Sequence, residues 1–237
     1  MQCDQERDDE KIMKRLNRGF LRCADFRAIA PHGMWHDGEE NADYVASNNC
    51  YEWYLSYPLN LRRNTARILE IGVRYGYSAV AMMMGATSRS SLVEYWGFDD
   101  GSYGADPLQQ KDRIQSLFSP GSIEMVLRRV NTQDVGRLDG VIGSFDILHV
   151  DALHTAGGEG EVHDLKLVAP FLKRGGIIIV DDATDGRASM MEVIPRVGSE
   201  LGLNCVYAPT FRGNIILFEG NIDDVFDLPP DSIEEMG

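Results

Sequence analysis

The order of segments from about residue 66 onward is the feature that most constrains the fold of this chain. Short apolar runs, several of them rich in isoleucine and valine, alternate there with longer segments of helical character. This alternation predicts βαβ units, and therefore a mostly parallel sheet with helices on both faces. The strand candidates are RILEIGV, VEYWGFD, IEMVLRRV, FDILHVD, GGIIIVDD, NCVYAPT and NIILFEG.

The last two strand candidates indicate how the sheet ends. Only FRG separates NCVYAPT from NIILFEG, and so short a connection cannot hold the crossover that joins parallel strands. The two runs are therefore expected to form an antiparallel hairpin at one edge. The sequence predicts a Rossmann-like α/β fold whose seven-stranded sheet is mostly parallel, with an antiparallel last strand and helices on both faces.

Helical segments between the first five strand candidates include YSAVAMMMGAT, PLQQKDRIQSLF and EVHDLKLVAPFLKRG. Residues 1–62 differ in character and are predicted to form a helical extension, with an amphipathic helix in DDEKIMKRLNRGFLRC and an aromatic-rich helix ended by Pro58. The extension either covers one face of the sheet or forms a lid over a substrate. In the second case Trp35, Tyr51, Trp53 and Tyr54 would supply stacking surfaces. Residues 63–222 then form one domain, and residues 223–237 form an acidic tail.

Charge and composition exclude several classes of partner. The formal net charge of the 237-residue chain is −14, and an acidic surface repels nucleic acid. No run of eighteen apolar residues is present, so no membrane span is expected. The N-terminus is acidic, unlike a secretory signal, and the four cysteines are scattered without C-x-x-C spacing. A cytoplasmic protein with reduced thiols is expected.

The glycine turn in ARILEIGVRYGYSAVAMMMG, residues 66–85, follows the first strand candidate. Its glycines, Gly72 and Gly76, do not fit the dinucleotide fingerprint G-x-G-x-x-G, because Arg74 stands at the middle position. No phosphate-binding P-loop pattern occurs anywhere in the chain. Glu70 ends the strand beside the turn, and a carboxylate there suits a ligand with an ammonium group. The turn therefore indicates an amino-acid-bearing cofactor, unless it only packs a helix on a strand.

The pattern E-x-G-x-x-x-G-x-S resembles the first motif of class I S-adenosylmethionine-dependent methyltransferases, and the terminal hairpin matches their sheet. The resemblance covers roughly residues 66–220, and GYSAV and VNTQDV look most like catechol O-methyltransferases. Asp99 ends the second strand candidate, where a carboxylate can accept both ribose hydroxyls. The resemblance places Thr132 and Gln133 near the adenine. The expected cofactor-binding residues are Glu70, Gly72, Gly76, Ser78, Asp99, Thr132 and Gln133.

Three carboxylates end the fourth and fifth strand candidates: Asp151, Asp181 and Asp182. Adjacent parallel strands deliver their carboxyl ends to the same crevice, and like charges so close cannot all stay ionised without a neutralising partner. A divalent cation with oxygen ligands, Mg²⁺ above all, is the simplest partner. The alternative is that one carboxylate caps a helix or turn and the cluster binds nothing. The Asp181–Asp182 pair is more similar to O-methyltransferases of macrolide sugars than to the catechol group.

His154 lies three residues after Asp151, where the resemblance to catechol O-methyltransferases places a catalytic lysine and some sugar enzymes have a histidine. A metal-bound hydroxyl has a lowered pKa, and a neutral imidazole beside it can accept the proton. His154 is therefore the expected catalytic base. His149 and His163 are expected to be structural. His32 and His36 lie in a loop-like segment, where a role in the substrate pocket is an alternative to a local one.

The sequence as a whole predicts a metal-assisted O-methyltransferase that acts on a hydroxyl of a small molecule, such as a natural product, a sugar or a phenol. Two rivals stay open: a natural-product oxygenase of the same fold, similar to cephalosporin hydroxylases, and a non-catalytic cofactor-binding regulator. An iron site of the oxygenase type would want two histidines with one carboxylate. The aromatic N-terminal helices could also bury themselves against a second subunit, which makes a homo-oligomer an open expectation.

Overall fold

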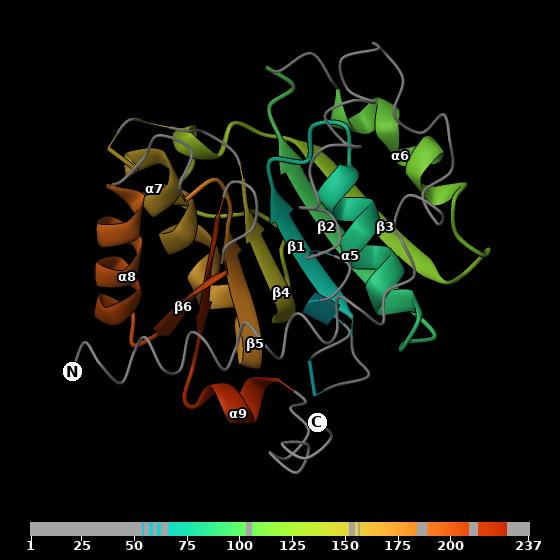
Figure 1. The fold of residues 1–237 in the computed structure, drawn as a ribbon. Coiled ribbons are helices and arrows are strands. Elements are labelled where there is room, and N and C mark those ends of the chain that lie inside the picture. The colour runs from blue at the N-terminus through green and yellow to red at the C-terminus, as the bar shows by residue number, and fades with distance from the viewer. Residues whose placement is uncertain are drawn as a thin grey trace, which may run out of the picture.

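The computed structural model describes residues 54, 57–58, 61–62, 66–102, 106–151, 155, 157–183, 189–208 and 213–226. Its sheet has seven strands in the order β3-β2-β1-β4-β5-β7-β6 (Figure 1). β1 to β5 are parallel to one another, and β7 is antiparallel to both of its neighbours. The strands are β1 (Arg67–Ile71), β2 (Val93–Asp99), β3 (Ile123–Arg129), β4 (Phe145–Val150), β5 (Leu172–Val180), β6 (Asn204–Ala208) and β7 (Asn214–Phe218).

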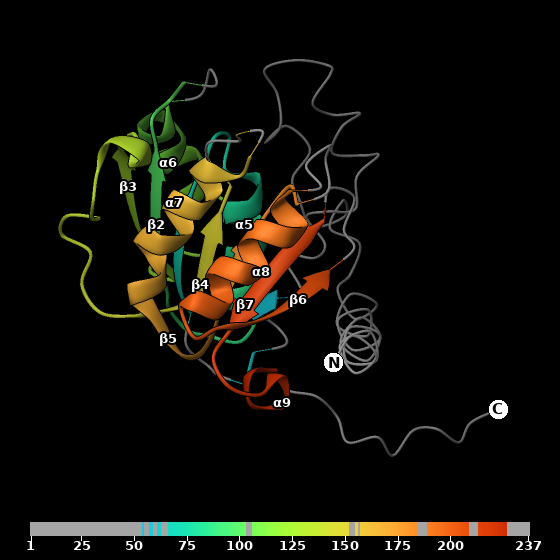
Figure 2. The same cartoon turned by 90° about the vertical axis from the view of Figure 1, so that its left-hand side faces the viewer.

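Helices pack on both faces of the sheet. Buried residues of α5 and α6 share a core with one face of the central strands, and those of α7 and α8 share a second core with the other face. Figure 2 views the molecule from the side of α7 and α8. The helices are α5 (Tyr77–Thr87), α6 (Pro107–Gln115), α7 (Glu159–Val168), α8 (Met190–Glu200) and α9 (Ile222–Val225), with 3₁₀ turns η1 (Thr132–Asp134) and η2 (Ala169–Phe171).

The predicted fold class is confirmed, including the terminal hairpin of β6 and β7. The helix predicted through EVHDLKLVAPFLKRG ends earlier, because Pro170 lies in η2 and the next strand already begins at Leu172. The helix α8 was not among the predicted segments. Its buried Met190, Ile194 and Val197 follow the spacing of a helical face, which is the signal that identifies it.

The strand order places the carboxyl ends of β1 and β4 at the point where the connections change direction. β1 continues to β2 on one side, whereas β4 pairs with its other side. Ligands of open α/β sheets bind in the crevice outside the strand ends at such a switch point. The glycine turn follows β1 and Asp151 follows β4, so both parts of the expected site lie at this crevice.

Parts of the chain on either side of the predicted central domain pack against it. Tyr54, Tyr57 and Leu61 are buried in the same core as α5. Phe226 is also buried there and forms an isolated antiparallel bridge with Leu61. The first residues of the predicted acidic tail therefore pack against the end of the predicted extension. Within the described part of the chain, no helix has both the length and the apolar character needed to cross a membrane.

Candidate active site

The glycine turn joins β1 to α5 through three residues with positive φ. Gly72 has φ 90°, Arg74 has φ 46°, and Gly76, the residue before α5, has φ 83°. The amide of Gly72 donates to the carbonyl of Phe98 at 2.8 Å, which ties the turn to the end of β2. A residue with a side chain rarely adopts such a backbone conformation. Glycine at position 76 therefore allows the turn to lead directly into α5.

Replacing Gly76 with alanine is expected to lower the free energy of unfolding by about 2 kcal/mol or more, because a left-handed conformation alone costs about 1–2 kcal/mol for a residue with a side chain. The added Cβ would also lie 2.5 Å from Cδ1 of Ile114. Gly121→Ala is the matched control, since Gly121 has φ +80° and nothing within 4 Å of its Cβ position. Urea unfolding of both variants measures the difference, and equal losses would contradict the clash with Ile114.

Asp99, the last residue of β2, hydrogen-bonds the backbone of the glycine turn. Its Oδ2 accepts the backbone N–H of Arg74 at 2.7 Å, and its Oδ1 accepts the N–H of Gly101 at 2.6 Å. The side chain is half-buried at the carboxyl end of β2, beside the glycine turn. Each carboxylate oxygen has a further lone pair, so both can still accept hydroxyl donors. The ribose contact of Asp99 stays a prediction.

Glu70 lies behind the turn, fully buried, and not at its open side. Its carboxylate accepts hydrogen bonds from the hydroxyls of Ser78 on α5 and Tyr95 on β2. Nδ1 of His149 lies 2.8 Å from its Oε1, because Glu70 and His149 are register partners on β1 and β4. Ser78, another predicted cofactor residue, is therefore held by Glu70 from the protein side.

Thr132 and Gln133 lie in η1, which packs on α7. The side-chain amide of Gln133 donates to Oδ1 of Asp164 at 3.0 Å and to the carbonyl of Gly160 at 3.3 Å. Nε2 of His163 donates to the carbonyl of Thr132 at 2.9 Å. Thr132 itself is buried. These contacts fix the backbone of the predicted adenine loop and give His163 the structural role that was expected of it.

The buried carboxyl group of Asp164 should make the free energy of unfolding depend on pH. Its side chain is fully buried, and this burial raises its pKa from 3.8 to about 6, against hydrogen bonds from Thr132 and Gln133. The folded protein thus holds this proton more tightly than the unfolded chain does. The resulting stabilisation is complete below about pH 4 and is lost as pH rises through 6. Asp164→Asn should remove about 1–3 kcal/mol of the difference in unfolding free energy between pH 4.5 and pH 7.

Denaturant unfolding of the two proteins at both pH values tests the effect of Asp164. Asp139→Asn is a suitable control, since its side chain is 76% exposed in an ion pair with Arg137. An equal pH dependence in wild type and Asp164→Asn would contradict the assignment.

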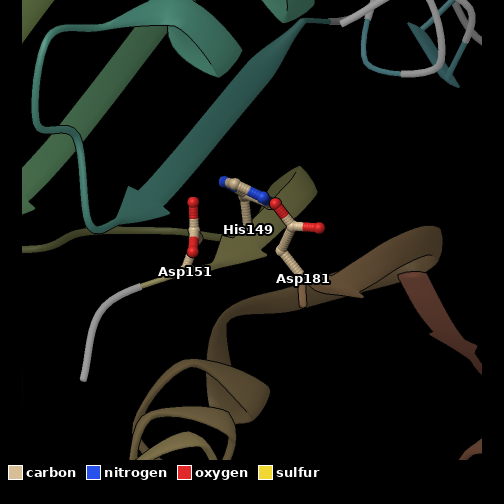
Figure 3. A group of neighbouring side chains, drawn as sticks. All are labelled: His149, Asp151 and Asp181. Carbon is tan, nitrogen blue, oxygen red and sulfur yellow. The ribbon is translucent and has the colours of Figure 1, made fainter. Parts of the chain in front are cut away.

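A group of three possible metal ligands lies at the carboxyl ends of β4 and β5 (Figure 3). His149, Asp151 and Asp181 each offer one ligand atom, and these atoms lie within 4.8 Å of one another. His149 and Asp151 share a face of β4 because side chains alternate along a strand. His149 pairs with Ile179, so Asp151 lies beside Asp181 at the next position of the same face. In Figure 3 the imidazole lies between the two carboxylates.

The electrostatics of this group favour a cation. Burial and, to a smaller extent, the charges of Asp151 and Asp182 together raise the pKa of Asp181 from 3.8 to about 7. Burial lowers the pKa of His149, but the hydrogen bond and the charge of Glu70 outweigh that effect and leave the pKa raised. The amide of Asn214 and the hydroxyl of Tyr54 hydrogen-bond Asp181 from β7 and from the N-terminal segment. The group therefore holds negative charge that a bound cation would neutralise.

The three predicted metal ligands differ in position. Asp151 and Asp181 come together, whereas Asp182 is 2% exposed, has φ 55°, and is not among the grouped ligand atoms. His149, expected to be structural, is the added member, and its spacing of two residues from Asp151 is the sequence signal for it.

Tyr54 is buried with its hydroxyl in this network, so it covers the sheet and is no stacking surface. The remaining predicted residues lie outside the part of the chain that the structure describes: His154, His32, His36, Trp35, Tyr51 and Trp53.

Comparison with known proteins shows a similarity to methyltransferases. Residues 69–183 match the model of a family described as a methyltransferase domain. The SAH-bound methyltransferase PaMTH1 of Podospora anserina is 16% identical, with a TM-score of 0.53, over 87% of this chain and 88% of that one. An O-methyltransferase of Bacillus cereus, in complex with SAH, is 13% identical, with a TM-score of 0.51, over 87% and 91%. No match is found among curated proteins.

Proposed function

We propose that the chain methylates a hydroxyl of a small molecule with the help of a divalent cation, because residues 69–183 match a methyltransferase-domain family and the fold is similar to that of an SAH-bound methyltransferase. The observation that carries this proposal is the grouping of His149, Asp151 and Asp181 at the same crevice as the glycine turn. A fold alone does not identify an acceptor, so the chemistry is argued from this group.

The cofactor would lie along the carboxyl ends of β1 and β2. Gly72 and Gly76, with positive φ, shape the turn beside which its amino-acid part would lie, and Asp99 would accept the ribose hydroxyls. Thr132 and Gln133 border the adenine. Glu70 acts from behind the turn, where it fixes Ser78 at the start of α5. This arrangement changes the expected role of Glu70 from direct contact with the ammonium group to orientation of the turn.

The residues of the acidic group fit a cation, because two carboxylates and an imidazole converge where burial makes unneutralised charge costly. A bound cation would lower the pKa of a coordinated acceptor hydroxyl. Asp151 and Asp181 would orient that hydroxyl in line with the methyl group, and His154 is proposed to accept its proton. Orientation then supplies most of the remaining rate enhancement, since methyl transfer is an in-line displacement.

The acceptor is proposed to be neutral or cationic, because the chain is strongly acidic and the site itself holds carboxylates. A natural product, a sugar or a phenol fits this description, and no nucleic-acid or membrane partner is proposed. A cytoplasmic location follows from the scattered cysteines.

Calorimetric titration of S-adenosylmethionine, S-adenosylhomocysteine and NAD into EDTA-treated protein tests the proposal, first without metal and then with Mg²⁺ or Mn²⁺. Binding of the two sulfur compounds and not of NAD is expected, followed by metal-dependent methylation in a screen of hydroxylated acceptors. Failure of both sulfur compounds to bind under any condition would overturn the function. Binding and turnover that ignore the metal would overturn only its metal-assisted part.

A further inference from the structure

We infer that His149 is itself a ligand of the proposed cation, through Nε2, and that the site therefore prefers a transition metal to Mg²⁺. The inference rests on the metal-assisted function proposed above. It adds a nitrogen ligand to a site for which the sequence predicted carboxylates alone.

The first step concerns the proton of His149. Its side chain is fully buried, and its Nδ1 lies 2.8 Å from Oε1 of Glu70. A carboxylate only accepts, so the hydrogen bond requires the proton on Nδ1. Nε2, which contacts the hydroxyl of Tyr54, is the ring nitrogen that a cation can then bind, and metal binding would release any proton held there. Ligating histidines in metalloproteins are held in the same way, by a carboxylate that accepts from the other ring nitrogen.

The second step concerns the direction of Nε2. It lies 3.2 Å from the hydroxyl of Tyr54, and this hydroxyl also hydrogen-bonds Asp181. Nε2 and the Asp181 carboxylate thus share the Tyr54 hydroxyl as a partner, and Figure 3 shows a ring nitrogen of His149 beside the Asp181 carboxylate. Two ligand atoms at ~2.1 Å from one ion are at most ~4.2 Å apart. The present separations of up to 4.8 Å therefore need only a small inward movement of the carboxylates.

The third step is the preference among cations. Mg²⁺ binds oxygen ligands and dehydrates reluctantly, whereas imidazole suits zinc, iron and other first-row transition metals. One imidazole and two carboxylates form a mixed set that Mn²⁺, Co²⁺, Fe²⁺ or Zn²⁺ accepts. Glu70 strengthens this preference, because a hydrogen-bonded carboxylate raises the basicity of the imidazole. Glu70 also holds Ser78, so it links the metal group to the glycine turn.

Pulsed electron paramagnetic resonance of the full chain loaded with Mn²⁺ tests the inference without relying on activity. Coupling to a directly coordinated ¹⁴N is expected in the wild type and in His154→Asn. It should be absent in His149→Asn. His154→Asn is the matched control, because His154 is the other histidine close in sequence to Asp151. Glu70→Gln serves if His149→Asn does not fold, and should bind Mn²⁺ about 10- to 100-fold more weakly.

The outcomes separate the inference from the function on which it rests. Bound Mn²⁺ without nitrogen coupling in the wild type, or coupling that persists in His149→Asn or vanishes in His154→Asn, overturns the ligand assignment alone. Unchanged Mn²⁺ affinity in Glu70→Gln also counts against it. If no divalent cation binds while S-adenosylmethionine does, the metal-assisted function fails and the inference fails with it.

Discussion

Replacing Asp151 or Asp181 with asparagine is expected to weaken Mn²⁺ binding at least about 100-fold, since loss of a mere outer-shell partner already costs about 10- to 100-fold. Each residue offers one of the three grouped ligand atoms, so its loss leaves two. Asparagine keeps the shape of the side chain and removes its charge. Methyl transfer to a hydroxyl acceptor should fall in parallel, whereas binding of S-adenosylmethionine in metal-free buffer should stay within a few-fold of wild type.

Calorimetric titration of the metal and of the cofactor into the same preparations separates these two effects. Asp182→Asn is an informative comparison, because Asp182 was predicted to be a ligand but is buried outside the grouped atoms. It should retain more metal affinity than either of the other two variants. Metal affinity that survives in both Asp151→Asn and Asp181→Asn would mean that the cation binds elsewhere.

Glu70→Ala is expected to lower the free energy of unfolding by about 3–5 kcal/mol, the range found when one partner of a buried ionic pair is removed. The change leaves the hydroxyls of Ser78 and Tyr95 and Nδ1 of His149 without their common acceptor. All four residues are buried, the most exposed being Ser78 at 7%. Water can therefore replace the lost carboxylate only if the core opens. Urea unfolding of metal-free protein gives the measurement.

Glu94→Ala is the matched control for Glu70→Ala. Glu94 lies on β2 and pairs with Arg67 at 2.7 Å, but its side chain is 37% exposed. Pairs that reach solvent contribute about 0–1 kcal/mol, so this variant should unfold close to wild type. Equal effects of the two changes would show that the buried network around Glu70 adds no more than a surface ion pair.

The strands and the terminal hairpin could be predicted because the signals are local. Each strand is a short apolar run, and the FRG connection alone specifies the antiparallel hairpin. The glycine turn was predictable for the same reason, since its glycines and Ser78 follow one another along the chain. The end of α7 was predicted too far along the chain, because apolar residues continue past Val168. Pro170 lies in the 3₁₀ turn that follows the helix.

The buried polar network could not be predicted from the sequence in this way. Glu70 and His149 meet only because β1 and β4 pair in one particular register, which a pattern of apolar residues does not specify. Tyr54 joins them across 95 positions of sequence. Asp182 shows the converse difficulty: it is adjacent to Asp181 and has a positive φ of 55°, and it is not among the grouped ligand atoms. The metal-ligand role of Asp182 stays a prediction, and His149 joins Asp151 and Asp181 in the group of possible ligands.

The bridge between Leu61 and Phe226 shows that the functional unit extends beyond the sheet domain on both sides. It joins the two flanks of the sheet domain, and the segment before it carries Tyr54 and Tyr57 into the core. The hydroxyl of Tyr57 donates to Asn214, whose amide in turn holds Asp181. A fragment that begins with the sheet domain would therefore lack Tyr54 and Tyr57, whose hydroxyls belong to the hydrogen-bond network around Asp181. If the domain is recombined with other proteins, by evolution or by engineering, these flanking residues have to accompany it.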